Sequence, residues 1–202
     1  MKDVKLVVIY YSSTGINHQL AQWAVEAAKE AGVGEVRLRK VKETAPKEAI
    51  AENEDWKKHV EETKDVEEAT MDDLEWANAY IFSAPTRYGN LPSQFKQFLD
   101  MTGGLWSSGK LANKVVSGMT SAANLHGGQE STLLSLYKTM FHWGALVVTP
   151  GYTDEVMFKA GGNPYGVSVT AGKNHLNEQI KAAVNHQVKR TLQIADLIIK
   201  RK

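Results

Sequence analysis

Residues 5–17 read KLVVIYYSSTGIN, and this stretch decides the fold class of the chain. Lys5–Tyr11 is a continuous run rich in β-branched and aromatic residues, which is typical of a strand buried on both faces of a parallel sheet. The small residues of Ser12–Gly15 end the strand, and a helix follows. The apolar face of that helix is formed by Leu20, Ala21, Ala24, Val25, Ala27 and Ala28.

The same alternation of strand and helix continues along the chain. Further strands are predicted at Glu35–Val41, Ala79–Ala84, Val115–Met119 and Ala145–Thr149. Helices are predicted at Met71–Ala77, Pro92–Met101, Gln129–Trp143 and about His175–Lys200. This order indicates a doubly wound α/β sandwich with a five-stranded parallel sheet and helices on both faces. No repeat or linker divides it, so we expect residues 1–202 to form a single domain.

The composition excludes several classes of protein. The 202 residues are 43% hydrophobic and 23% charged, as in a globular domain. The net charge of +1 argues against a nucleic-acid partner held by a broad basic face. Cysteine is absent, so any redox chemistry must come from a bound cofactor. No run of apolar residues is long enough to span a membrane or to act as a cleaved signal, so we expect no membrane partner and a cytoplasmic location.

Residues 42–75 differ in charge from the rest of the chain. They hold 13 of the 23 acidic residues and only 5 of the 24 basic ones. Such a run is most often a solvated insertion or a surface helix. The alternative is a docking surface for a basic patch on another subunit.

Three loops fall where parallel strands end, which is where ligands bind in such sheets. In the first, Ser12–Asn17, three hydroxyls and the start of a helix can hold a phosphate group. It lacks the lysine of a nucleotide-triphosphate loop and the GxGxxG of a dinucleotide fold, which favours a monophosphate. The alternative is an ordinary helix cap of Ser and Thr.

The second loop, Pro85–Pro92, combines the donor fork of Arg87, the ring of Tyr88, and Gly89 and Asn90, which permit unusual backbone angles. The third, Thr120–Gly128, offers backbone amides that can hold the polar edge of a flat heterocycle. Read alone, the second is a surface turn and the third a flexible loop. Only ligand binding accounts for all three at one edge of a sheet.

The remaining motifs point to no metal or hydrolase. The six histidines have no metal-ligand spacing, and GxSxG is absent. Trp106 lies in a glycine-flanked loop, where it is either exposed at a site or an anchor in a core or interface. His142, near the end of the predicted helix at 129–143, is either functional or a structural histidine.

The chain resembles a known family, the flavodoxin-like type IV NAD(P)H:quinone oxidoreductases, or WrbA-like proteins. The resemblance rests on six blocks, in family order and covering most of the chain. They are YYSSTG at 10–15, PTRYGN at 85–90, FLDMTGGLWSSGKL at 98–111, GGQE at 127–130, HWG at 142–144 and GGNPYGVSVTAG at 161–172. A plain flavodoxin carries neither PTRYGN nor TGGLW.

The resemblance implies a flavodoxin-like fold, non-covalent FMN and a homotetramer. The FMN phosphate is expected at Ser12, Ser13, Thr14, Gly15, Ile16 and Asn17. The isoalloxazine and ribityl chain are expected against the loop of Pro85, Thr86, Arg87, Tyr88, Gly89 and Asn90. The loop that wraps the flavin ring is expected at Thr120, Ser121, Ala122, Ala123, Asn124 and Gly127. His142 and Trp106 match catalytic positions that face the flavin and the quinone or nicotinamide pocket.

The chain departs from the family in five places. Thr14 stands where a tyrosine on the nicotinamide side is frequent, and Asn17 stands where isoleucine is usual. Trp143 replaces a second histidine, and the 120–127 loop is one residue longer. The acidic segment after Pro46 follows no family pattern.

These observations favour an FMN-dependent NAD(P)H:quinone oxidoreductase. Such an enzyme reduces quinones to hydroquinones by two-electron ping-pong turnover, with NAD(P)H as co-substrate. The first alternative is a flavodoxin-type electron carrier, but carriers of that type are smaller and strongly acidic, whereas this chain is nearly neutral. The second is a regulatory module that binds flavin only structurally.

Overall fold

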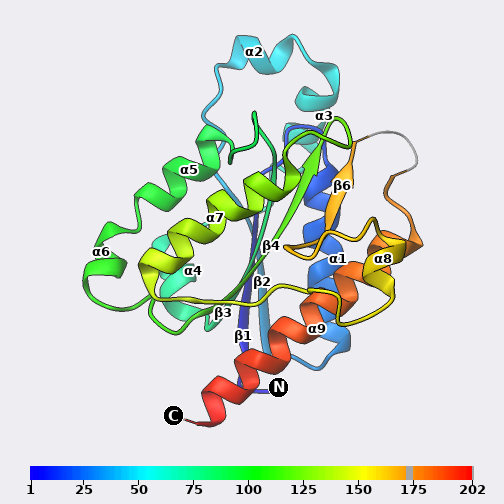
Figure 1. The fold of residues 1–202 in the computed structure, drawn as a ribbon. Helices are drawn as coiled ribbons and strands as arrows, with labels where there is room; N and C mark the ends of the chain where they lie inside the picture. Colours follow the sequence, from blue (N-terminus) through cyan, green and yellow to red (C-terminus); the bar gives the residue numbers. More distant parts are fainter. Residues whose placement is uncertain (172–174, 202) are drawn as a thin grey trace.

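The computed structural model of the protein describes residues 1–171 and 175–201 (Figure 1). Its strands are β1 (Lys5–Tyr10), β2 (Glu35–Lys40), β3 (Ala79–Pro85), β4 (Val115–Ala122), β5 (Leu146–Val147) and β6 (Ser168–Thr170). Its helices are α1 (Ile16–Glu30), α2 (Lys47–Ala51), α3 (Glu54–Glu62), α4 (Met71–Trp76), α5 (Ser93–Asp100), α6 (Gly103–Ser107), α7 (Gln129–Trp143), α8 (Val156–Lys159) and α9 (Glu178–Lys200). Gly172, the last residue of the block at 161–172, and Lys202, the last of the predicted domain, lie outside the described residues.

The described strands form one parallel sheet in the order β2-β1-β3-β4-β5, with β6 also paired to β4. The prediction of a doubly wound α/β fold is therefore confirmed. Strand order reverses between β1 and β3, because the chain moves outward to β2 and then returns past β1. Ligand sites in such sheets lie beyond the carboxyl ends of the strands at this reversal.

The fifth position of the sheet differs from the prediction. We expected one strand over Ala145–Thr149, but β5 is two residues long and pairs only with Val115 and Val116. β6 pairs with the other end of β4, from Thr120 onward. Proline cannot donate to a ladder, so the chain leaves the sheet before Pro150 and returns only at β6. Six strands thus fill the five predicted positions.

Strand β4 is also longer than predicted. We expected a loop from Thr120 onward, but Thr120–Ala122 continue the strand, paired with β3 on one side and β6 on the other. Small polar residues are typical of loops, yet here both neighbouring strands satisfy their backbone groups.

Two helix predictions are corrected as well. Trp106, expected in a loop, lies in the short helix α6. The last helix begins at Glu178 rather than at His175, because the Asn177 side chain accepts hydrogen bonds from two backbone amides of the first turn and caps the helix there.

Helices cover both faces of the sheet (Figure 1). The alternation of β1 explains the two cores: Leu6 and Val8 pack with α1 and α9, whereas Val7 and Ile9 pack with α4, α5 and α7. Burying an aliphatic side chain of this size contributes roughly 1.5–3 kcal/mol, so the first strand helps to stabilise both layers. None of the described helices is long and apolar enough to cross a membrane.

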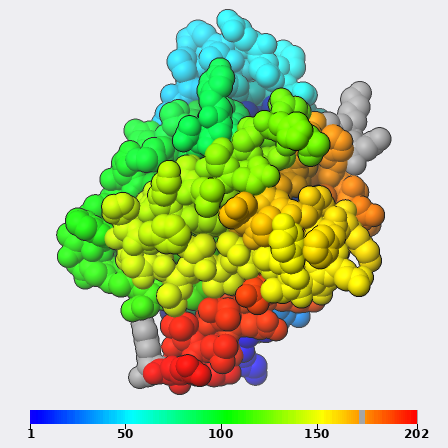
Figure 2. All heavy atoms as spheres, viewed as in Figure 1, coloured from blue at the N-terminus to red at the C-terminus, as the bar shows by residue number. Residues whose placement is uncertain are grey.

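The acidic segment forms α2, α3 and α4. Helices α2 and α3 project beyond the carboxyl edge of the sheet, at the top of Figures 1 and 2. Some of its charge is neutralised within the chain. Buried Asp73 accepts hydrogen bonds from Arg37 Nη1 at 3.0 Å and Arg39 Nε at 3.1 Å, and Arg39 also pairs with Glu67 at 2.9 Å. Burial opposes ionisation of Asp73, but these guanidinium groups and the Thr70 donors keep its pKa below the usual value.

Candidate functional site

A cavity of about 590 Å³ lies where β1, β3 and β4 end, a volume usual for small-molecule sites. The structure brings the three predicted loops together around it. Of the residues predicted to bind the cofactor, those that line it are Ser12, Ser13, Thr14, Ile16, Asn17, Pro85, Thr86, Arg87, Tyr88, Ser121, Ala122, Ala123, Asn124 and Gly127.

The loop after β1 is shaped for an anion. Gly15 has a φ of 95°, which lets the chain turn sharply into α1, and its amide donates to Ser12 Oγ at 3.0 Å. Arg87 Nη2 donates to Ser13 Oγ at 2.9 Å, which brings a positive charge to the same loop. Hydroxyls, a guanidinium and the amino end of a 15-residue helix form a donor set that fits the phosphate of FMN.

Asn17 lies at the floor of the cavity and ties α1 to two strands, β3 and β4. Its amide nitrogen donates to Ser121 Oγ at 2.7 Å, and Ser83 Oγ donates to its backbone oxygen at 3.1 Å. Asn17 is 1% exposed, so its side-chain amide serves this network rather than a phosphate. The departure from the expected isoleucine therefore adds a hydrogen-bonded brace beneath the phosphate loop.

The loop after β3 is a tight hairpin turn. Arg87 and Asn90 exchange backbone hydrogen bonds, while Tyr88 and Gly89 between them have φ values of 51° and 76°. Positive φ at both central residues is the requirement of a type I′ turn. The turn leaves the Tyr88 side chain fully exposed at the cavity, free to pack against a ligand. Gly89 and Asn90 shape the turn and do not themselves line the cavity.

The loop after β4 packs closely against the end of its own strand and against the loop after β3. A Cβ built on Gly127 would lie 2.5 Å from Ala122 Cβ, and one built on Gly128 would lie 2.7 Å from Gly89 Cα. Only glycine permits this approach, and it leaves exposed backbone against which a flat ring can lie. Thr120 is not part of this wall: it is buried in β4 and donates to Ala84 O at 2.7 Å.

Three lining residues were not predicted: Asn53, Trp56 and Ala171. Asn53 and Trp56 belong to the start of α3, inside the acidic segment that we had expected to be a solvated insertion. A tryptophan in a largely polar helix was the available signal in the sequence. Trp56 Nε1 donates to Glu43 Oε2 at 3.0 Å, and so does the Tyr11 hydroxyl. Burial and the charge of Glu43 raise the pKa of Tyr11 to about 12, so the phenol keeps its proton.

His142 and Trp106 lie together but away from the cavity of their own chain. Trp106 Nε1 donates to the backbone oxygen of His142 at 2.8 Å. His142 lies in the last turn of α7, whereas the cavity lies at the first turn, which is ~20 Å away at 1.5 Å per residue. The expectation that His142 lies over the flavin is therefore not met within one chain, because α7 carries it to the opposite edge of the sheet.

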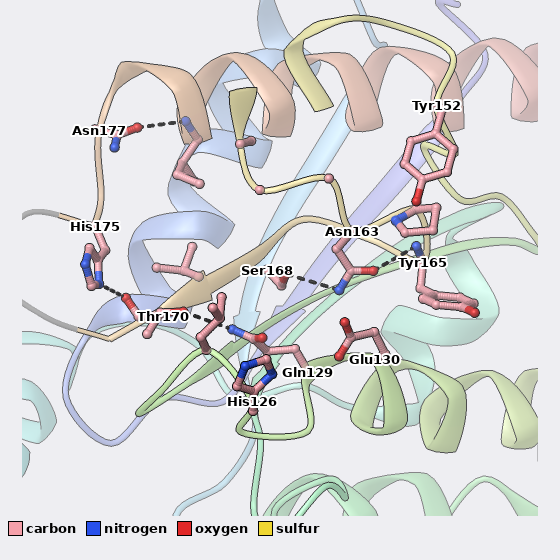
Figure 3. A pocket seen from close by; sticks show the side chains of 17 residues that line it. His126, Gln129, Glu130, Tyr152, Asn163, Tyr165, Ser168, Thr170, His175 and Asn177 are labelled. Atoms are coloured by element: carbon pink, nitrogen blue, oxygen red, sulfur yellow. Dashed lines mark hydrogen bonds between the residues drawn. The ribbon is translucent and has the colours of Figure 1, made fainter. Parts of the chain in front are cut away.

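A second cavity, of about 650 Å³, lies beside β6 (Figure 3). Its polar lining groups largely bond to one another: Asn163 Nδ2 donates to Ser168 Oγ at 3.1 Å, and Gln129 Nε2 donates to Thr170 Oγ1 at 3.4 Å. It lacks the phosphate loop, the arginine and the strand reversal of the first cavity. The smaller cavity is therefore the candidate cofactor site, because the donors and the topology agree there.

The fold and this cavity together define a flavodoxin-like α/β domain. Solved structures share that fold at low sequence identity. A WrbA-like flavodoxin from Agrobacterium tumefaciens is similar with a TM-score of 0.62 at 21% identity, over 99% of this chain and 100% of that one. Flavodoxin 2 from Bacillus cereus is similar with a TM-score of 0.62 at 14% identity, over 94% and 99%.

Sequence comparison gives the family. The chain belongs to the NADPH-dependent FMN reductase family, whose sequence profile matches residues 4–155. It is 56% identical over 191 residues to an NAD(P)H dehydrogenase (quinone) of Deinococcus radiodurans, covering 95% of both chains. It is 39% identical over 205 residues to an NAD(P)H dehydrogenase (quinone) of Geotalea uraniireducens, covering 95% of this chain and 98% of that one.

Proposed function

We propose that residues 1–202 form one flavodoxin-like domain that binds FMN and acts as an NAD(P)H dehydrogenase of quinones. The observation that carries the proposal is the convergence of three loops on one cavity, with Arg87 joined to Ser13 at its phosphate end. The chain has no cysteine to carry electrons. FMN, when bound at this cavity, would supply the two-electron redox chemistry between NAD(P)H and a quinone, in a ping-pong cycle.

The residues of the chain bind and orient the cofactor. The loop from Ser12 to Ile16 holds the phosphate, and Arg87 balances its charge. The hairpin turn with Tyr88 and the loop at 121–127 hold the flavin ring between them. Asn17, bonded to Ser121 and Ser83, fixes the loops relative to one another before the cofactor arrives. Because the binding loops are ordered in advance, little conformational entropy is lost on binding.

The site is completed by assembly into a homotetramer. Around His142 the surface carries apolar side chains that no described residue covers: Trp106 is 55% exposed and Phe141 62%. Exposed aromatic residues of this kind mark contact surfaces between proteins. We propose that His142 and Trp106 reach the flavin site of a neighbouring copy, where His142 orients the substrate. A monomer in sedimentation at micromolar concentration, with FMN present, would contradict this.

The test of function is turnover. Protein reconstituted with FMN is expected to oxidise NADH or NADPH with benzoquinone as acceptor and to release hydroquinone in equal amount. A cytoplasmic location stays a prediction of the same proposal. FMN binding without turnover would favour the alternative of a flavodoxin-type electron carrier, for which the acidic helices α2 and α3 offer a docking face.

A further inference from the structure

Helix α3 forms a wall of the cofactor cavity, although it belongs to an acidic insertion. Asn53 and Trp56 line the cavity together with Thr14 and Arg87. They also bind to each other, because Asn53 Oδ1 accepts a hydrogen bond from the Trp56 amide at 3.0 Å. The wall is therefore one small unit, the capped first turn of the helix.

Glu43 fixes this wall to the body of the protein. Its two carboxyl oxygens accept five hydrogen bonds from described residues. Oε2 accepts from Trp56 Nε1 and the Tyr11 hydroxyl, both at 3.0 Å. Oε1 accepts from Gln94 Nε2 at 2.8 Å and from the amides of Thr44 and Ala45 at 2.9 Å. One side chain thus joins the end of β1, the start of α5 and the indole of α3.

The far end of α3 is anchored as well. His59 is buried, and its ring lies 5.4 Å from the ring of His18, which stacks on Tyr10 at 4.7 Å. A Cβ on Gly15 would lie 3.7 Å from His59 Nδ1, so the helix rests against the phosphate loop. Lys40 Nζ donates to Thr63 O at 2.6 Å, which ties the residue after α3 to β2. A helix with these contacts is a fixed wall and not a loose insertion.

The chemistry of the wall selects a flat ring over a phosphate. The indole N–H is used by Glu43, so Trp56 offers a ligand only aromatic surface. The cap leaves the amide group of Asn53 able to donate to a carbonyl or a ring nitrogen. Glu54 and Asp55 in the same turn are exposed and acidic, which opposes phosphate binding there. An aromatic face beside an amide donor suits a neutral or cationic heterocycle.

The order of the strands in the sheet indicates which ligand lies against Trp56. The flavin ring is assigned to the loops after β3 and β4, whereas the end of α3 is bonded to β2 through Lys40 and Thr63. Strand β2 lies at the opposite end of the order β2-β1-β3-β4. The room beside Trp56 and Thr14 is thus left for the second ligand. We propose that Trp56 is a binding residue for the nicotinamide dinucleotide, stacking on one of its planar rings, and that Glu43 is the positioning residue that holds the indole in place.

This inference rests on the proposed function, and the experiment separates the two. The variant Trp56→Ala is expected to raise the KM for NADH and NADPH about threefold to tenfold, with kcat at saturation little changed. Calorimetry with NAD⁺ and NADP⁺ on the FMN-loaded protein is expected to show the same rise in Kd. FMN affinity, measured by flavin fluorescence on the apoprotein, is expected to stay near that of the wild type.

Two further variants keep the test independent of folding. Trp56→Phe retains a ring but loses its bond to Glu43, and Glu43→Gln removes charge and acceptor capacity while leaving the indole. Both are expected to raise KM by less than Trp56→Ala does. Glu48→Gln, with the same charge change on exposed α2, and Trp23→Phe, on α1, are the matched controls and are expected to behave like the wild type.

The outcomes are distinct. A loss of FMN affinity with unchanged dinucleotide Kd would show that Trp56 contacts the flavin, and this would overturn the proposal. Unchanged KM and Kd in all three variants would reduce the wall to a structural one, which also overturns it. A wild type that binds FMN but never turns over would instead overturn the proposed function, and the calorimetric comparison would still decide the role of Trp56.

Discussion

The two ends of α7 differ in how their surroundings are packed. At its first turn, Thr132 Oγ1 donates to Thr86 Oγ1 at 2.7 Å and Ser131 Oγ donates to Gly89 O at 3.0 Å, so the cavity loops are held by bonds within one chain. At its last turn, the Trp106 ring and Phe141 stand exposed. The loops at the cavity end are held by bonds within one chain, whereas the aromatic residues at the other end stay exposed among the described residues. Cofactor binding and turnover are therefore expected to respond separately to mutation.

The strongest test of this separation is His142→Ala. Turnover with benzoquinone is expected to fall about 10²-fold, because an imidazole that orients substrate or stabilises developing charge typically contributes this much. FMN affinity is expected to change much less than turnover, because the loops that line the cavity are unaltered in this variant. Steady-state kinetics at full flavin occupancy measures the fall in turnover. Lys138→Ala, exposed on the same helix, is the control; equal turnover in both variants would return His142 to a structural role.

The reciprocal test acts on the cavity end. Gly128 has a φ of 87°, and a Cβ there would lie 2.7 Å from Gly89 Cα, so Gly128→Ala adds backbone strain and a clash between two cavity loops. Strain of this kind is worth roughly 1–3 kcal/mol, which predicts FMN binding weaker by about 5- to 150-fold. Fluorescence titration of the apoprotein measures it.

The control for that variant comes from the other end of the comparison. In Gly103→Ala, on α6, the new Cβ meets no described atom within 4 Å, and FMN affinity is expected to stay as in the wild type. Equal losses in the two glycine variants would mean that general destabilisation, and not the packing of the cavity loops, sets the affinity.

A smaller effect is expected from Thr14→Tyr, which alters the mouth of the cavity. Thr14 is exposed and lines the cavity on the side of Trp56, so a ring there offers a second stacking face worth roughly 0.5–1.5 kcal/mol. The KM for the nicotinamide co-substrate is expected to fall about threefold to tenfold. FMN affinity should change little, because the Ser13 hydroxyl and Arg87 remain. Weaker FMN binding with unchanged nicotinamide kinetics would assign Thr14 to the phosphate site alone.

The cavity was largely predictable from the sequence, for a physical reason. Parallel strands buried on both faces read as apolar runs, and the residues directly after them must gather at one edge of the sheet. Ser12–Asn17 and Pro85–Arg87 could therefore be placed together without knowing any contact. The length of β4 was misjudged because Thr120–Ala122 resemble a loop locally, and only pairing with the distant β6 makes them a strand.

The parts that were missed depend on contacts between residues far apart in the sequence. Trp56 lies at the cavity because Glu43, Tyr11 and Gln94 meet in three dimensions, and no periodicity encodes that meeting. The separation of His142 from the cavity, in contrast, could have been predicted. A helix of 15 residues that begins at the carboxyl edge of the sheet must end at the other edge.

The last expected effect concerns pH and acts at the cavity end. Burial and the neighbouring His59 lower the pKa of His18 to about 4, from 6.5 in an unfolded chain. Between these values the unfolded chain binds a proton that the folded protein does not, so the free energy of unfolding falls as the pH drops from 6.5 toward 4. Above this window His18 contributes no pH dependence.

His18→Phe keeps a ring against Tyr10 and removes the titrating group, so its loss of stability between about pH 7 and pH 5 is expected to be shallower than in the wild type. Urea unfolding midpoints at the two pH values measure this. Trp23→Phe, on the same helix α1, removes no titrating group, so it is the control and is expected to keep the wild-type slope. A wild-type slope in His18→Phe would mean that the stack beneath the phosphate loop admits a proton without loss, and that the cavity end is less rigid than its hydrogen bonds indicate.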